Sequence, residues 1–272
     1  MKNRNEIKIT LRHVEDIKKW FYTYVQNFKH GNQATTENTI LKEKHSIRVS
    51  SEILHIGHSL ELNTDELHLA EITAFLHDIG RFEQYARYKT FADGKSVNHA
   101  LLGVEILTKN KVLNAFEEPI KNLILRIISY HNRASLPDDE TKTCLFFAKL
   151  LRDADKLDIF RVVTNYYRQK GSHRNEALEL DLPDTPEFSD QIIKDLMNKQ
   201  IVDIKHVKSL NDFKLLQVGW IFDINFDATF SAVRSRRYLD IIQEALPDSK
   251  KIQELFEIIQ IYLTEKIDGA KK

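Results

Sequence analysis

Apolar residues recur at helical spacing along almost the whole chain, and this periodicity constrains the fold more than any other feature. Residues 14–28 show it well, because Ile17, Phe21, Tyr24 and Phe28 fall on one face of a helix. Only 8 Gly and 5 Pro interrupt the 272 residues, and 29% of the residues are charged. Few helix breakers and many charges are typical of helices that expose a solvated face. The sequence therefore predicts an all-α protein.

Turn residues divide the periodic pattern into separate helices. The predicted helices cover residues 14–28, 37–62, 67–79, 97–108, 119–130, 141–167, 188–199, 212–246 and 249–267. Asn63 begins a predicted N-terminal cap, and Ser96 is predicted to cap the helix that follows it. Gly80 is expected to end the helix before it, because glycine commonly follows the last helical residue.

The segment 171–187 contains two prolines and is the predicted boundary between a core and a C-terminal part. The expected organisation is an N-terminal helix over residues 1–36 that packs on the core, the core itself over residues 37–170, and a helical extension over residues 171–272.

Composition excludes several functional classes. The formal net charge is zero, which argues against a general nucleic-acid binder because such proteins are normally basic. Cys144 is the one cysteine, so no internal disulfide can form, and its apolar neighbours predict a buried, inert thiol. No stretch approaches the roughly 20 apolar residues of a membrane span, and the charged first ten residues lack the apolar core of a signal peptide. The protein is therefore expected to be cytoplasmic, without membrane contact.

The adjacent pair His77 and Asp78 carries the most chemical information. Imidazole and carboxylate groups bind divalent metal ions, but neighbours in mid-helix diverge by about 100° and rarely reach one ion. This pair closes an apolar helical run, where two neighbours can do so. Four further residues of these types lie in segments predicted to be helical: His45, His99, His131 and Asp155. Together the six residues predict a metal site that several helices assemble.

The six residues, in this order, resemble the HD-domain superfamily of metal-dependent phosphohydrolases. That pattern is a His, a His-Asp pair, often two more His, and a final Asp. The local sequences that strengthen the resemblance are Lys-His-Ser at His45, Leu-His-Asp-Ile-Gly-Arg at His77, Asn-His-Ala at His99, Ile-Ser-Tyr-His at His131 and Ala-Asp-Lys-Leu at Asp155. The resemblance covers residues 38–165. It implies an HD-type helical bundle in which the six residues bind one or two divalent ions.

The resemblance also implies a reaction. This is hydrolysis of a phosphomonoester or phosphodiester, with a nucleotide as the expected substrate, by a metal-activated water. The expected catalytic residues are Asp78, His99, His131 and Arg81. Nitrogen and oxygen ligands suit Mn, Fe, Co, Ni or Mg, and Asp78 would bridge two ions. The expected partners are a small phosphorylated substrate and a second copy of the chain.

Other functions stay open. A few HD-type proteins activate O₂ at a di-iron pair, so an oxygenase is one alternative, and a metal-bound regulatory or binding module without turnover is another. Cyclic di-GMP is not the expected substrate, because no Gly-Tyr-Pro signature follows the site and Asn132 stands where that subgroup often has a His. Residues 212–246 are expected to form a core helix, or alternatively a helix that closes the pocket and supplies an arginine.

Alternatives also remain among individual ligands. Asp155 competes with Asp153 and Asp158 for the final carboxylate position, and the family pattern favours Asp155. Asp158 lies one helical turn further and is predicted to orient Asp155. His55 and His58 have a spacing that could share an ion, but no carboxylate accompanies them, so an exposed helix face is the expected interpretation.

Overall fold

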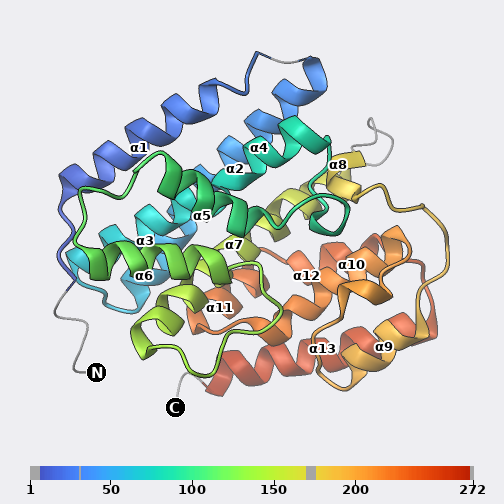
Figure 1. Cartoon of the computed structure of the whole chain (residues 1–272). Helices are drawn as coiled ribbons and strands as arrows, with labels where there is room; N and C mark the ends of the chain where they lie inside the picture. The colour runs from blue at the N-terminus through green and yellow to red at the C-terminus, as the bar shows by residue number, and fades with distance from the viewer. Residues whose placement is uncertain (1–6, 31, 170–175, 270–272) are drawn as a thin grey trace. The chain divides into compact units, whose positions relative to one another are not determined.

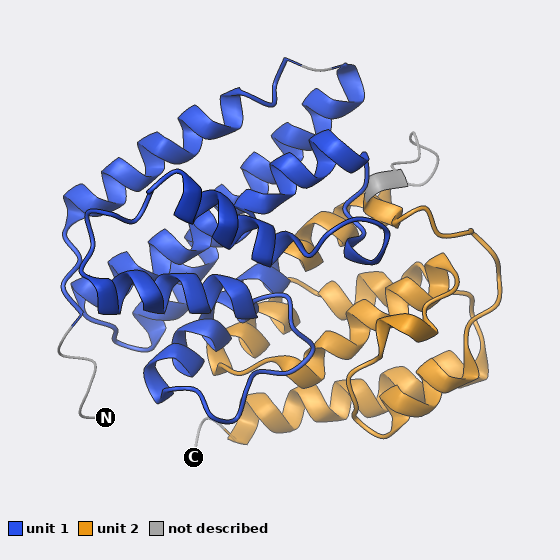
Figure 2. Ribbon diagram, viewed as in Figure 1, with its two compact units in different colours: residues 1–158 blue, residues 159–272 orange. Residues whose placement is uncertain are grey.

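The computed structural model describes residues 7–30, 32–169 and 176–269, and no strand occurs in these ranges (Figure 1). The predicted all-α class is confirmed. The chain divides into two compact units, residues 1–158 and residues 159–272, and the division falls inside one long helix (Figure 2). The predicted domain limits after residues 36 and 170 stay predictions, and residue 170 lies outside the described residues.

Unit 1 is a helical bundle in which α2 packs on α3 and α4 packs on α5. Its elements are α1 (Leu11–Gln26), α2 (Gln33–Ser59), α3 (Thr64–Leu76), α4 (Ile79–Tyr88), the 3-10 turn η1 (Asp93–Lys95), α5 (His99–Lys109), α6 (Glu118–Tyr130) and the part of α7 (Lys142–Arg168) that ends at Asp158. Helix α3 contacts α1, α2 and α6, while α5 contacts α4 and α6. The rings of Phe21, Phe75 and Phe82 meet edge to face, with centroids 5.4 and 6.0 Å from Phe21. These three rings join α1, α3 and α4 in the core.

Capping side chains set where two of these helices begin. Asn63 caps α3 as predicted, because its side chain accepts from Glu66 N–H and the Glu66 carboxylate accepts from Asn63 N–H, both at 3.0 Å. The predicted Ser96 cap is wrong: Asn98 accepts from Leu101 N–H at 3.0 Å, and Ser96 donates to a backbone carbonyl instead. Both residue types cap helices well, so local sequence could not choose between them. Helix α5 consequently begins at His99.

Gly80 does not end a helix, contrary to the prediction. Helix α3 ends at Leu76 and α4 begins at Ile79, so His77 and Asp78 form the corner between two helices and Gly80 lies in the first turn of α4. A Cβ atom on Gly80 would lie 2.1 Å from the His99 carbonyl oxygen. Glycine is required there because α4 approaches α5 closely, and a long-range contact of that kind leaves no local signature.

Unit 2 contains mostly shorter helices than the sequence predicted. They are the rest of α7, α8 (Glu176–Glu179), α9 (Asp190–Met197), η2 (Ile204–His206), α10 (Leu210–Gly219), η3 (Trp220–Asp223), α11 (Asp227–Ser235), α12 (Tyr238–Glu244) and α13 (Lys250–Gly269). The predicted single helix over residues 212–246 is wrong. Ile224 and Phe226 have extended backbone, and Arg237 is left-handed with φ 55°, so the helical hydrogen bonding breaks twice.

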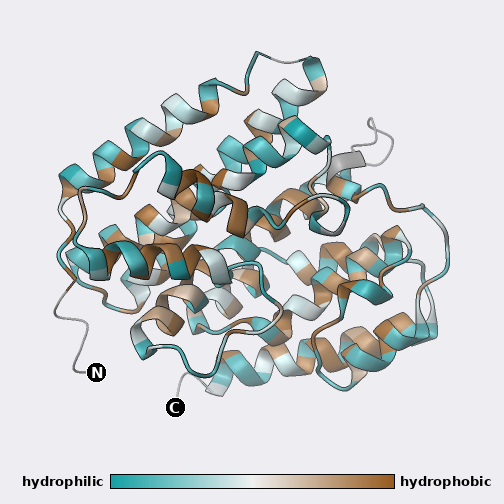
Figure 3. Ribbon diagram, viewed as in Figure 1, coloured by the Kyte–Doolittle hydropathy of each residue, from teal (hydrophilic) through white to brown (hydrophobic). Residues whose placement is uncertain are grey.

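Most helices of both units are amphipathic. Figure 3 shows hydrophobic and hydrophilic residues alternating along most of them, which is the pattern that the sequence periodicity predicted. None of the described helices combines the length and apolar character that a membrane span requires.

Candidate metal centre

The ends of four helices and the middles of two others deliver the six predicted residues to one place in unit 1. His77 follows α3, Asp78 precedes α4, and His131 follows α6. His45 projects from α2 and His99 begins α5. All five of these residues are buried, and Asp155 of α7 is half-buried. The corner positions explain why neighbouring residues in sequence can face the same point.

The four imidazoles form two pairs on the two oxygens of Asp78. His45 Nε2 and His77 Nε2 lie 3.3 Å apart, and they are 3.5 and 3.8 Å from Asp78 Oδ2. His99 Nε2 and His131 Nε2 lie 2.9 Å apart, and they are 3.3 and 3.7 Å from Asp78 Oδ1. We name His45, His77 and Asp78 Oδ2 the first cluster, and His99, His131 and Asp78 Oδ1 the second cluster. Each has the size and donor atoms to hold one metal ion.

Asp155 faces the first cluster. Its Oδ1 atom lies 3.1 Å from His45 Nε2 and 3.7 Å from His77 Nε2. That oxygen is buried and has no hydrogen bond of good geometry. Buried carboxylate oxygens are costly without a partner, so the position is suited to a cation. Asp158 points to a different atom, as described below.

Each of the four imidazoles has a hydrogen-bond acceptor at Nδ1. The acceptors are Asp158 Oδ2 for His45 at 2.7 Å, the Ala74 carbonyl for His77 at 2.7 Å, Asp93 Oδ2 for His99 at 2.8 Å and the Ile128 carbonyl for His131 at 2.7 Å. An acceptor at Nδ1 favours the tautomer with its proton there. All four Nε2 lone pairs are thereby aimed into the clusters, which is the arrangement that metal-binding histidines require.

The charges of the site have clear physical causes. Burial raises the pKa of Asp78, but Lys42 and His77 outweigh it and hold that pKa well below its usual range. Burial also raises the pKa of Asp155, yet the nearby imidazoles of His45 and His77 bring it well below the usual value. The two carboxylates are therefore ionised.

The pKa values of His99 and His45 are shifted in opposite directions. Burial, helped by Arg81, lowers the pKa of His99 to about 3 and keeps that ring neutral. Burial and Lys42 lower the pKa of His45, but the neighbouring carboxylates of Asp155 and Asp158 raise it more, so it lies above its ordinary value.

The nitrogen and oxygen atoms of the two clusters fit the ligand preferences of divalent metal ions. In the second cluster, neutral His99 directs its Nε2 lone pair at His131 Nε2 from 2.9 Å, and two lone pairs repel unless a proton or a cation lies between them. The first cluster adds the unpartnered Asp155 oxygen. Imidazole nitrogen and carboxylate oxygen are ligands of first-row divalent metals. The ligand roles of the individual residues remain proposals.

Lys42 is a component of the site that the sequence analysis missed. Its ammonium donates to Asp78 Oδ2 at 2.8 Å and lies 5.3 Å from the centre of the Phe91 ring. Lys42 precedes His45 by three residues on α2, so helical spacing places both side chains on one face. That spacing was the available signal, although many solvent-exposed lysines share it.

Arg81 and Asp158 lie close to the clusters but contact other groups than expected. Arg81 Nη1 donates to Gln84 at 2.9 Å and to Asp93 at 3.0 Å, and its predicted phosphate contact stays a prediction. Asp158 does not orient Asp155, contrary to the prediction. It accepts from His45 Nδ1 and from Arg48 Nη2, the latter at 2.8 Å. One helical turn along α7 is enough to direct the two carboxylates at different atoms.

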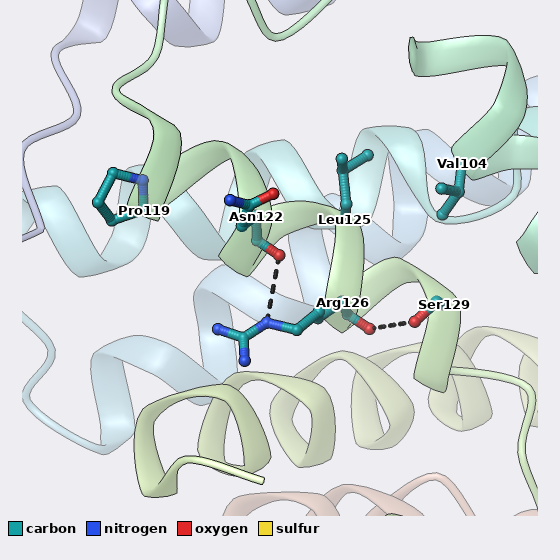
Figure 4. A pocket seen from close by; sticks show the side chains of 6 residues that line it. All are labelled: Val104, Pro119, Asn122, Leu125, Arg126 and Ser129. Atoms are coloured by element: carbon teal, nitrogen blue, oxygen red, sulfur yellow. Dashed lines mark hydrogen bonds between the residues drawn. The ribbon is translucent and has the colours of Figure 1, made fainter.

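Two other features are separate from the clusters. His55 and His58 are exposed on α2, as expected for a solvated helix face. A surface depression on α5 and α6, shown in Figure 4, is lined by Val104, Pro119, Asn122, Leu125, Arg126 and Ser129. Within it, Arg126 Nε donates to the Asn122 carbonyl at 3.4 Å. None of these lining residues is a predicted ligand.

Comparison with known proteins agrees with this geometry. A family model described as HD domain matches residues 43–159, a range that includes all six residues. A stretch of 80 residues is 39% identical to a single-strand-specific deoxyribonuclease, Cas10/Csm1 of a subtype III-A CRISPR system, from Methanocaldococcus jannaschii. That match covers 28% of this chain and 10% of the relative, so the chain corresponds to a small part of it. No solved structure matches the chain.

Proposed function

Because residues 43–159 are an HD domain, we propose that this protein is a divalent-metal-dependent phosphohydrolase. Its substrate would be a phosphomonoester or phosphodiester, with a nucleotide as the first candidate. One observation carries the proposal: two histidine pairs face the two oxygens of a single buried, ionised carboxylate. Two ions bridged by one carboxylate are a recurrent arrangement for phosphoester hydrolysis.

The side chains of this site would bind the metal ions and would supply positive charge around them. Bound divalent ions supply an activated water and neutralise charge on the phosphoryl group. Asp78 would join the two clusters, and Asp155 would complete the first. Lys42, 2.8 Å from Asp78 Oδ2, and Arg81, with Nε 3.5 Å from Asp78 Oδ1, add positive charge on opposite sides of the carboxylate. This charge favours entry of an anionic phosphate.

A panel of phosphoesters and metals tests the proposal. We expect hydrolysis of p-nitrophenyl phosphate, of bis-p-nitrophenyl phosphate or of both when Mn or Co is supplied, and loss of that activity with a chelator. Re-addition of the metal should restore it, because the helical core does not depend on the ions for its apolar packing. Absence of turnover with every metal, together with consumption of O₂ by the iron-loaded protein, would instead favour the oxygenase alternative.

Single-stranded DNA is a second candidate substrate, because the curated relative is a single-strand-specific deoxyribonuclease. The zero net charge of the chain counts against it, since affinity for nucleic acid rests largely on phosphate neutralisation by basic residues. The same panel therefore includes a short single-stranded oligodeoxynucleotide, its duplex and nucleoside monophosphates. Cleavage of the single strand alone would favour the nuclease function, and release of phosphate from mononucleotides alone would favour the nucleotide phosphatase.

The number of ions gives a separate prediction. His131 contributes to the second cluster only, while His45, His77 and Asp155 remain available to the first. The wild-type protein saturated with Mn is expected to approach two ions per chain, and His131→Ala about one. Elemental analysis after gel filtration measures both ratios. A wild type that stays near one ion, with an inactive His131→Ala that keeps it, would make His131 a substrate contact.

A further inference from the structure

Asp93, in the short turn η1, makes an unusual number of contacts for a loop carboxylate. Its two oxygens accept from His99 Nδ1 at 2.8 and 2.9 Å. They also accept from Arg81 Nη1 at 3.0 Å, Gln84 Nε2 at 2.9 Å and Asn132 Nδ2 at 3.0 Å. Four side chains thus converge on one carboxylate, and charge-assisted hydrogen bonds of this kind are the strong ones.

The four donors come from the three elements that carry the second cluster. Arg81 and Gln84 lie on α4, which begins directly after Asp78. His99 begins α5, and Asn132 follows His131 at the end of α6. Asp93 therefore joins the backbone segments of all three residues that define the second cluster, and it touches one of their side chains directly.

Asp158 makes similar contacts beside the first cluster, but it lies on a different kind of element. It accepts from His45 Nδ1 and from Arg48, both on α2, and it lies on α7 one turn after Asp155. Its side chain is 0% exposed, whereas that of Asp93 is 31% exposed. The first cluster is thus supported by a buried carboxylate on a long helix, and the second by a partly exposed carboxylate on a short turn. Loops open more readily than packed helices.

We propose that Asp93 is the positioning residue for the second cluster and that it controls whether a divalent ion occupies that cluster. The inference rests on the proposed function, because it assumes that the two clusters are ion sites. Asp93 would act by keeping the Nδ1 proton on His99 and by holding the ends of α4, α5 and α6 together. Loss of such an outer acceptor typically reduces metal affinity by about 10- to 100-fold.

Two reciprocal variants test the proposal. Asp93→Asn keeps the shape of the side chain but cannot serve four donors, and Asp158→Asn makes the same change at the first cluster. Asp139 is exposed, so Asp139→Asn is the matched control for the loss of one carboxylate charge. Calorimetric titration with Mn and the electron paramagnetic resonance signal of a coupled Mn pair measure occupancy. In Asp93→Asn we expect affinity for the second ion to fall about 10- to 100-fold, with the first ion unaffected and the coupled signal lost.

A measurement on the metal-free protein separates positioning from general destabilisation. Imidazole ¹⁵N chemical shifts report the tautomer of each histidine. In Asp93→Asn the signals of His99 should change while those of His45 stay, and Asp158→Asn should give the reverse. If Asp93→Asn does not fold, Asn132→Ala removes one donor to the same carboxylate and should weaken the second ion in the same direction.

Each result of these experiments either supports or overturns the proposed role of Asp93. Wild-type affinity for two ions in Asp93→Asn, or equal weakening of both ions, overturns the proposal. A wild type that binds a single ion overturns it as well, but leaves hydrolysis by one ion open. Selective loss of the second ion in a protein that hydrolyses no phosphoester would support the role of Asp93 and refute the proposed function.

Discussion

Replacement of Asp78 by alanine is expected to remove both metal ions and to abolish phosphoester hydrolysis. Asp78 is the one residue common to the two clusters, and each of its oxygens faces a histidine pair. Without it, both histidine pairs lose the one carboxylate that they share. We expect a loss of activity of at least about a thousandfold, equivalent to about 4 kcal/mol of transition-state stabilisation. Steady-state kinetics with Mn and elemental analysis measure the two effects.

Asp139→Ala is the control for this variant, because that carboxylate is exposed in the same unit. It should keep two ions and wild-type activity. Circular dichroism should show similar helical content in both variants, since the apolar core of the bundle is unchanged. Hydrolysis at the wild-type rate by metal-depleted Asp78→Ala would refute the assignment of the site.

Gly80→Ala is expected to destabilise unit 1 and to disturb the second cluster. The new Cβ would lie 2.1 Å from the His99 carbonyl oxygen and 2.8 Å from Gly103 N, and both are backbone atoms. Helices α4 and α5 must therefore separate, which moves His99 away from Asp78. Overpacking of this kind costs about 1–3 kcal/mol and sometimes more. The same substitution in an unhindered helix would stabilise by about 0.5–1 kcal/mol. Urea unfolding monitored by circular dichroism gives the difference.

Gly94→Ala is a demanding control for that prediction. A Cβ at Gly94 has no atom within 4 Å, so its effect on unfolding should stay within about 0.5 kcal/mol. Because Gly94 adjoins Asp93, a small effect of Gly94→Ala would show that a substitution near the second cluster is not by itself destabilising. If the two variants unfold alike, close packing of α4 on α5 is not what requires glycine at position 80.

The helices and the six residues were accessible from sequence because their signals are local. A helix bonds each residue to the fourth one before it, so periodic apolar residues and caps such as Asn63 predict its position. The motifs around His77 and Asp155 are likewise a few residues long. These signals sufficed for the all-α class and for the set of residues that the structure places together.

The remaining features were decided by tertiary structure, because they depend on residues far apart in the chain. The contact of His45 with Asp158 joins residues 113 positions apart, and that of Asn132 with Asp93 joins residues 39 apart. Gly80 has a role only because α5 passes beside it. The division of four histidines into two pairs on the two oxygens of Asp78 is also a result of packing, since it depends on where four helices end in space. Local sequence determined which groups this protein carries, and the packing of the helices determined what each group faces.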